Sequence, residues 1–256
     1  MQNSLIVSGI KGLPELKPGD DLAKLIQESM NKQDLEFQCK DILVVTQKIV
    51  SKIEGRTVDL RTIIPSERAK KFAIEWDKDA RVTELVLRES VRVLRMQYGI
   101  IISENKNGFV CANAGIDASN VGRKGDNHVV LLPVDCDKSS AMIRARIKEL
   151  TGVEVAVIIS DTFGRPWREG AINVAVGASG IAPLMDYRGL DDNDGREMHS
   201  TTIAIVDELA SAGELVMNKI DRIPVALIRG YAYETSNENE IGIRALIRDS
   251  QKDLFP

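Results

Sequence analysis

The chain has 256 residues, of which 43% are hydrophobic and 28% are charged. This is an ordinary composition for a globular protein, and it excludes a disordered chain. The formal net charge is -4 and the pI is about 5.4, so no overall field favours a nucleic acid or an anionic membrane as a partner. A local group of basic side chains must therefore hold any anionic substrate.

The cysteines and the N-terminus bear on the compartment. Cys39, Cys111 and Cys136 are widely spaced and match neither a zinc site nor a disulfide framework. The first residues lack a basic leader and a small-residue cleavage site. No apolar stretch approaches the roughly 18 residues that span a bilayer. We therefore expect a cytoplasmic protein with reduced thiols and without a membrane or nucleic-acid partner.

Short β-branched runs alternate with helical patterns along the chain. Asn107-Gly108 separates two of these runs and predicts a tight antiparallel hairpin, because both residue types accept a positive φ. Strands are predicted at residues 5–10, 42–46, 100–104, 109–112, 129–132, 155–160 and 225–231.

Capping residues mark several of the helices. Asp21 and Ser66 are suited to N-cap positions, and Gly152 ends another helix. Three segments rich in Gly and Asp are predicted to be long functional loops, at 115–127, 161–180 and 186–196. We expect an α+β protein with mixed sheets, forming one unit of two closely packed lobes over residues 1–256. Helices are predicted at residues 22–30, 67–76, 82–95, 137–150, 203–217 and 238–248.

A carboxylate and a hydroxyl follow the most apolar strand. Residues 155–160 form a continuous apolar run, which predicts a strand buried on both faces. Asp161 and Thr162 come at its carboxyl end, where ligands commonly bind in α/β sheets. Their oxygens suit Mg²⁺ or Mn²⁺ bridging to phosphates. The alternative is that Asp161 only caps a turn.

Two arginines follow this pair. Arg165 and Arg168 are three residues apart, and guanidinium groups hold phosphates and carboxylates through paired hydrogen bonds. They are therefore candidate catalytic residues for a substrate phosphate or carboxylate. As solvated surface charges they would have no such role.

Two further segments carry candidate site residues. Asp117 lies among amides and Gly115, and it could face Asp161 as a shared metal ligand or belong to a network of Asx turns. Lys48 and Lys52 share one face of a short helix predicted after Thr46. They could receive phosphates together with the helix N-terminus, or simply be exposed.

Several familiar sites are excluded. The Asp-rich segment at 186–196 fails as a calcium loop because Leu190 stands where the first ligand should be. The N-K-x-D pattern at 218–221 has no phosphate-binding loop to accompany it. With His128 and His199 as the only histidines, histidine-based catalysis has little to draw on.

Together these segments resemble one family, the F420-0:γ-glutamyl ligases. The conjunction spans nearly the whole chain in family order. The matching segments are residues 12–14, 17–22, 44–46, 48–52, 54–56, 65–69, 113–121, 160–166, 177–180, 194–197, 215–217 and 223–230.

The resemblance implies a GTP-dependent ligase that attaches L-glutamate to the deazaflavin coenzyme F420 precursor through an acyl phosphate. It also implies an intertwined homodimer of two-lobed subunits, the use of two divalent ions, Mg²⁺ or Mn²⁺, and stimulation by K⁺. Metal would lie on Asp117, Asp161 and Thr162. Nucleotide would contact Leu13, Pro14, Glu15, Leu16, Gln47, Lys48, Lys52, Asn120 and the loop with Met217, Asn218, Lys219 and Asp221.

The sequence departs from the family pattern at three places. Asn218 and Lys219 stand where an acidic or amide ligand of the second metal is usual, which leaves that role to Asp221 or water. Gln47 replaces a small hydroxyl residue, and we expect no flavin-reductase-like extension after Pro256. Two alternatives stay open: a ligase of the same architecture acting on another carboxylate, and a nucleotide-binding regulator without catalysis.

Overall fold

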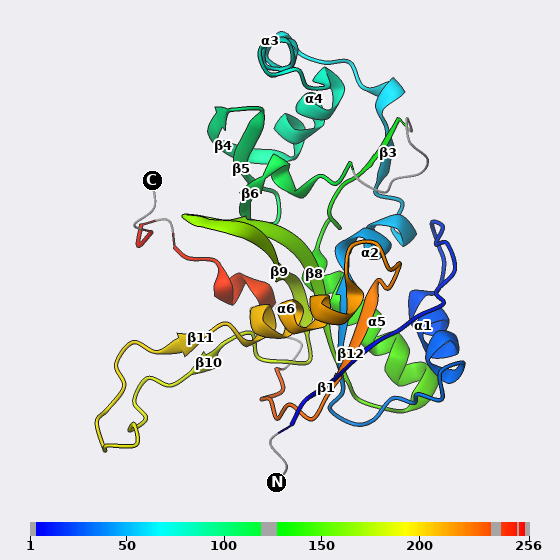
Figure 1. Cartoon of the computed structure of the whole chain (residues 1–256), viewed down its shortest axis with the longest axis vertical. Coiled ribbons are helices and arrows are strands. Elements are labelled where there is room, and N and C mark those ends of the chain that lie inside the picture. The colour runs from blue at the N-terminus through cyan, green and yellow to red at the C-terminus, as the bar shows by residue number, and fades with distance from the viewer. Residues whose placement is uncertain (1–3, 119–126, 237–241, 250, 254–256) are drawn as a thin grey trace.

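Five strands form a mixed sheet at the centre of the computed structural model, which describes residues 4–118, 127–236, 242–249 and 251–253 (Figure 1). β2 and β8 are parallel, and the other neighbours are antiparallel. In sheet order the strands are β1 (Ile6–Gly9), β12 (Val225–Arg229), β2 (Ile42–Thr46), β8 (Ala156–Arg165) and β9 (Arg168–Ser179).

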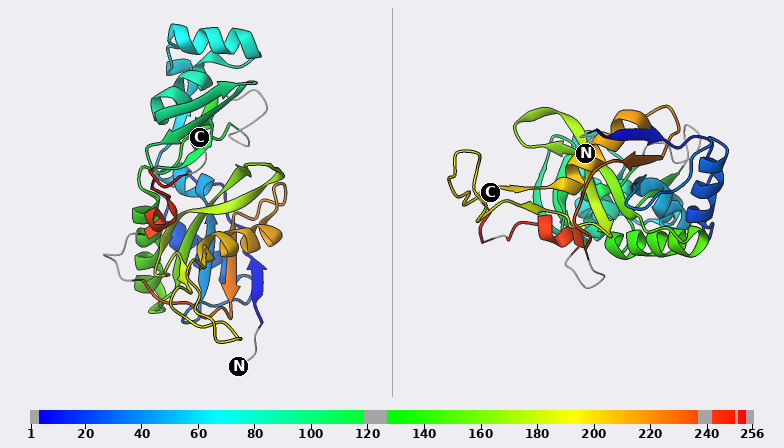
Figure 2. Two further views of the ribbon diagram at one scale, coloured as in Figure 1. Left: turned by 90° about the vertical axis from the view of Figure 1, so that its left-hand side faces the viewer. Right: turned by 90° about the horizontal axis from the view of Figure 1, so that it is seen from below.

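Helices cover both faces of this sheet. α5 (Cys136–Thr151) packs on one face with α1 (Leu22–Asn31) against it, and α6 (Ile205–Met217) covers the other face (Figure 2). The three inner strands, β12, β2 and β8, are buried along their apolar runs. The burial predicted for residues 155–160 is therefore confirmed, as are the caps at Asp21 and Gly152.

β8 and β9 form a long hairpin that leaves the sheet. β2 accompanies β8 only as far as Ser160, which lies opposite Thr46. Beyond that point β8 pairs with β9 up to Arg165 and Arg168, which flank the turn. The prediction of a loop over 161–180 was wrong, because the exposed end of this hairpin has no alternating apolar pattern for a sequence to reveal.

The elements from β3 to β7 form what we call the second region, which lies at one end of the sheet (Figure 1). It has its own small apolar clusters, around Phe72 and Val86 and around Leu60 and Leu85. The hairpin predicted at Asn107-Gly108 is confirmed between β5 and β6. The elements are β3 (Thr57–Asp59), α3 (Glu67–Trp76), α4 (Ala80–Glu89), β4 (Ser90–Gln97), β5 (Ile100–Asn105), β6 (Val110–Ala112) and β7 (His128–Val130).

One predicted helix in this region was wrong over its second half. α4 ends at Glu89, and the chain continues as β4 instead of remaining helical to residue 95. Tyr98 and Gly99, both with positive φ, turn the chain back so that β4 pairs with β5. The apolar residues of β4 fit helical spacing as well as strand spacing, so pairing with a distant segment decided the outcome.

The remaining elements are short. β10 (Met185–Asp186) and β11 (Thr202–Ile203) pair at the base of an exposed excursion. In the described part of residues 238–248, the predicted helix is reduced to a 3-10 helix, Gly242–Leu246. The architecture confirms an α+β fold with mixed sheets and an antiparallel hairpin. None of the helices within the described ranges has the length and apolar character needed to cross a membrane.

Candidate functional site

A cavity of about 1020 Å³ opens where β2 ends and β8 continues past it, between the sheet and the second region. Segments far apart in the sequence meet there: residues 13–16, the start of α2 (Gln47–Ile53), the chain after β6, and the loop after α6. The predicted site residues that line it are Leu13, Pro14, Glu15, Leu16, Gln47, Lys48, Lys52, Asp117, Asp161, Thr162, Asn218 and Lys219.

Four predicted residues do not line this cavity. The Met217 side chain is fully buried in the core and does not line the cavity. Asp221 is exposed and accepts a hydrogen bond from the Asn218 amide at 2.9 Å. Arg165 and Arg168 lie at the exposed tip of the β8–β9 hairpin, where Arg165 donates to the carbonyls of residues 169 and 170. Asn120 lies outside the described residues.

Asp161 occupies the first position of β8 beyond the part that β2 accompanies. Its carboxylate accepts the backbone N–H of Thr162 at 2.8 Å. Burial, with the negative charge of Asp117 as a further contribution, raises the pKa of Asp161 to about 7, although the Thr162 N–H, Lys219 and Lys48 act in the opposite direction. A carboxylate with so raised a pKa in a cavity is characteristic of a functional site.

The second region delivers the other carboxylate. Asp117 forms a two-bond bridge with Val130 of β7, both N–O distances being 2.9 Å. Its side chain reaches Lys48 of α2, with 2.6 Å between Oδ2 and Nζ. Phe109 also packs edge-on against Phe163 of β8, with the ring centroids 6.1 Å apart. The two acidic groups expected to meet therefore line the same cavity.

Sequence reasoning missed two polar residues of this site, Asn173 and Glu214. The Thr162 hydroxyl donates to the Asn173 side-chain oxygen at 2.7 Å, and the Asn173 amide donates to Glu214 at 2.8 Å. Lys219 contacts the Thr162 hydroxyl and lies 3.5 Å from Glu214. Asn173 escaped notice because β9 was interpreted as a loop. Glu214 was an unremarked polar position in a predicted helix.

Two buried groups at the cavity help to define its chemistry. Among the described buried side chains, Ser160 Oγ has no hydrogen-bond partner, and a bound water, ion or substrate at the cavity would satisfy such a group. Burial, with a smaller contribution from Asp161, raises the pKa of the Cys111 thiol to about 12. Cys111 therefore stays protonated and is a poor nucleophile.

The donors suit a hard divalent cation. Asp117, Asp161 and Thr162 offer carboxylate and hydroxyl oxygens, and Mg²⁺ commonly uses one or two carboxylates together with substrate phosphates and water. Within the described ranges, no group of three or more His, Cys, Asp or Glu side chains forms an all-protein metal cage. The residues present thus fit an ion whose remaining ligands come from a substrate.

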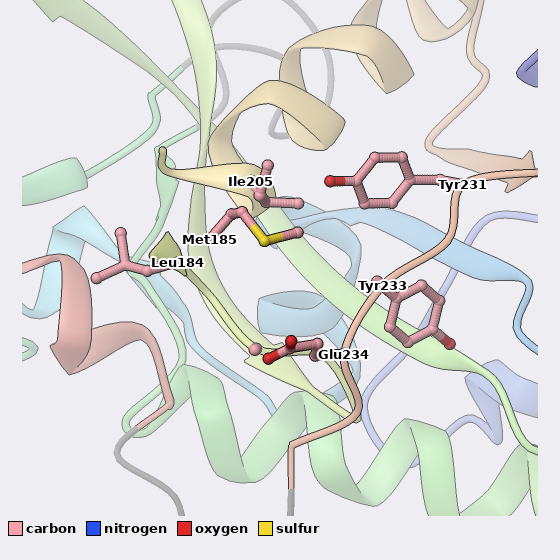
Figure 3. Close-up of a pocket in the computed structure, with 7 residues that line it drawn as sticks. Leu184, Met185, Ile205, Tyr231, Tyr233 and Glu234 are labelled. Atoms are coloured by element: carbon pink, nitrogen blue, oxygen red, sulfur yellow. The ribbon is translucent and has the colours of Figure 1, made fainter. Parts of the chain in front are cut away.

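A second hollow lies away from this site, between β10 and the chain after β12. Figure 3 shows Tyr231, Tyr233, Met185 and Ile205 around it. Its volume is about 10 Å³, which leaves room for no more than one water molecule. Burial raises the pKa of Tyr233 to about 12, so its phenol stays neutral. This hollow cannot hold a substrate.

A large cavity lined by carboxylates and lysines is the arrangement expected of an enzyme that acts on small charged molecules. The sequence profile of the F420-0:Gamma-glutamyl ligase family matches residues 9–230. The chain therefore belongs to this family and is an enzyme of the ligase class, which confirms the resemblance drawn from its motifs.

Individual relatives agree with this assignment. The chain is 42% identical to the coenzyme F420:L-glutamate ligase of Methanothermobacter thermautotrophicus, over 96% of this chain and 97% of the relative. It is 44% identical to the protein of that name from Methanopyrus kandleri, over 94% and 93%. It is 43% identical to that from Methanocaldococcus jannaschii, over 95% and 94%. The match thus covers nearly the full length of each relative.

Proposed function

We propose that this protein joins L-glutamate to the glutamate-free form of coenzyme F420 in a reaction that consumes GTP and requires Mg²⁺ or Mn²⁺. The observation that carries the proposal is the meeting of Asp117 and Asp161 in one cavity with Lys48, Lys52 and Lys219. Near-full-length relatives named for this ligation support the choice of substrates. Further γ-linked additions, a K⁺ requirement and a homodimer belong to the same proposal.

The reaction forms an amide through an activated acid. A carboxylate of the coenzyme attacks the γ-phosphorus of GTP, the bond to the β-phosphate oxygen breaks, and GDP leaves. The glutamate amine then attacks the acyl phosphate, loses a proton and displaces inorganic phosphate. Catalysis of this type depends on alignment and charge neutralisation, and none of these steps requires a protein nucleophile.

The residues of the cavity divide these tasks. Lys48 and Lys52 come from successive turns of α2 and would bind nucleotide phosphates. Asp117 and Asp161 would hold the divalent ion, which stabilises charge on the transferring phosphoryl group when bound. In the structure Lys48 pairs with Asp117, so phosphate would have to draw the lysine from the carboxylate as the ion arrives.

The direct test is incubation of the purified protein with GTP, Mn²⁺, L-glutamate and glutamate-free F420, followed by mass spectrometry. We expect a product heavier by one or more glutamyl units and release of GDP and phosphate in equal amounts. GTP turnover only with another carboxylate acceptor would overturn the choice of substrate. Nucleotide binding without any turnover would indicate a regulator and contradict the proposal.

A further inference from the structure

We propose that the site holds one divalent ion, between Asp117 and Asp161, and that the Lys219 ammonium supplies the positive charge that a second ion would bring. The inference rests on the proposed function for its nucleotide, but the number of ions can be measured without turnover. It concerns the side of the cavity formed by β8, β9 and α6.

Lys219 is held by two groups that would otherwise be available to a metal. Its ammonium donates to the Thr162 hydroxyl oxygen and lies 3.5 Å from Glu214 Oε1. The other carboxylate oxygen of Glu214 accepts the Asn173 amide at 2.8 Å. Both oxygens of the Glu214 carboxylate are therefore already in contact with a donor, one with the Lys219 ammonium and the other with the Asn173 amide.

Thr162 connects Lys219 to Asn173 and so completes a closed circuit of polar contacts, whose members are Lys219, Thr162, Asn173 and Glu214. A hydroxyl has one proton and two lone pairs, and Thr162 gives its proton to the Asn173 side-chain oxygen at 2.7 Å. One lone pair faces the Lys219 ammonium. A divalent ion on Thr162 would have to lie beside that ammonium, which like-charge repulsion opposes.

The same loop offers no carboxylate as a replacement ligand in the cavity. Asp221 is exposed, does not line the cavity, and accepts a hydrogen bond from Asn218. Lys219 is the residue of this loop that reaches Thr162, and its side chain is 63% exposed at the lip of the cavity.

The charges favour a single ion. When all are ionised, the four acidic side chains that line the cavity balance the four basic ones; the acids are Glu15, Asp117, Asp161 and Glu214, and the bases are Lys48, Lys52, Lys219 and Arg222. One divalent ion leaves an excess of two positive charges, which suits a nucleotide polyphosphate. A second ion would raise the excess to four positive charges before any nucleotide binds.

Equilibrium dialysis of the whole protein against Mn²⁺ measures the number of ions directly. We expect one tightly held Mn²⁺ per chain, both with Mn²⁺ alone and with a non-hydrolysable GTP analogue on both sides of the membrane. Lys219→Gln removes the ammonium, frees Glu214 and supplies an amide oxygen, so we expect it to hold two. Lys219→Glu should also hold two. Circular dichroism verifies that each variant is folded.

Lys52→Gln is the matched control, since Lys52 lines the same cavity but lies outside the circuit. It should weaken nucleotide binding and leave the count at one. Two ions in the unsubstituted protein, one ion in both Lys219 variants, or two in Lys52→Gln would each overturn the proposal. If the analogue is not retained, the assignment of GTP fails, while the arm with Mn²⁺ alone still decides the number of ions.

Discussion

Glu84 in the second region and Asp161 at the end of the five-stranded sheet are carboxylates in opposite surroundings. Glu84 accepts the Ser66 N–H at 2.9 Å and pairs with Arg88 at 2.8 Å. These donors, Ser66 above all, lower the pKa of Glu84 to about 2. The pKa of Asp161 is instead raised to about 7, chiefly by burial.

The difference separates a structural acid from a functional one. Glu84 ties the start of α3 to α4, and its charge is compensated within the fold. Asp161 keeps a buried carboxylate at a cavity, and Thr162 N–H, Lys219 and Lys48 compensate its charge only in part. This costs folding stability and prepares the group for a cation. The same residue chemistry thus serves α3–α4 packing in one region and prepares a ligand site in the other.

The largest expected effect is on turnover. Asp161→Asn and Asp117→Asn each remove a carboxylate from the proposed ion and should lower kcat by on the order of 10²-fold or more. Steady-state assays of glutamate ligation check this. Asp186→Asn, an exposed acid paired with Arg188, is the control and should retain activity. Normal kinetics in both cavity variants would remove the basis of the proposed site.

Two glycines of the β8–β9 hairpin test the contrast between its buried and exposed ends. A Cβ at Gly177 would lie 2.4 Å from the Cys136 carbonyl oxygen on α5, whereas a Cβ at Gly164 would meet nothing within 4 Å. Gly177→Ala should therefore cost about 1–3 kcal/mol of unfolding free energy. Gly164→Ala should cost almost none. Chemical denaturation measures both, and equal losses would contradict the described packing.

Glu84→Gln should reduce the unfolding free energy by about 1 kcal/mol at neutral pH, because it removes charge-assisted hydrogen bonds. The folded-state pKa lies below the ordinary 4.5. The contribution of Glu84 is therefore fully present above pH 4.5 and is lost as the pH falls towards 2. Denaturation at a series of pH values should show the wild type and the variant converging in acid. A constant difference would argue against the ion pair.

Asp161→Asn should have the opposite effect on the metal-free protein. Its folded-state pKa of about 7 lies above the ordinary 3.8, so the folded protein holds the proton more tightly than the unfolded chain does. The resulting cost is absent below pH 3.8 and complete above pH 7. The variant should therefore gain in Tm, relative to wild type, between pH 5 and pH 8. No gain would mean that the charge is already compensated.

The smallest effect is expected at the hairpin tip. Arg165→Ala and Arg168→Ala change a half-buried and an exposed side chain, both outside the cavity lining, and turnover should stay within about twofold of the wild type. This opposes the role predicted from their spacing. A tenfold or larger loss would restore the arginines as substrate-binding groups and show that the tip reaches the reacting molecules.

The central sheet was largely predictable from the sequence. The apolar run at 155–160 and the caps at Asp21 and Ser66 are local signals, and each is confirmed. β4 and β9 were missed because their conformations depend on pairing with β5 and β8, not on their own residues. Local periodicity has no access to such long-range contacts.

The residues of the site were likewise only in part predictable from the sequence. Asp117, Asp161 and Lys48 can be recognised in the sequence because each is a charged residue within a short, otherwise largely uncharged segment. All three line the cavity. Asn173 and Glu214 become visible only when β9 and α6 bring them to Thr162. Arg165 was placed at the site by its closeness in sequence to Asp161, but a strand carries the chain about 3.3 Å further with each residue.

The most direct test of the account is the position of the metal. Crystals of the protein soaked with Mn²⁺ and GDP should show one anomalous-scattering peak within bonding distance of both the Asp117 and the Asp161 carboxylates, with the Lys48 ammonium displaced towards phosphate. A peak elsewhere, or an intact Lys48–Asp117 pair beside bound nucleotide and no metal, would contradict the account.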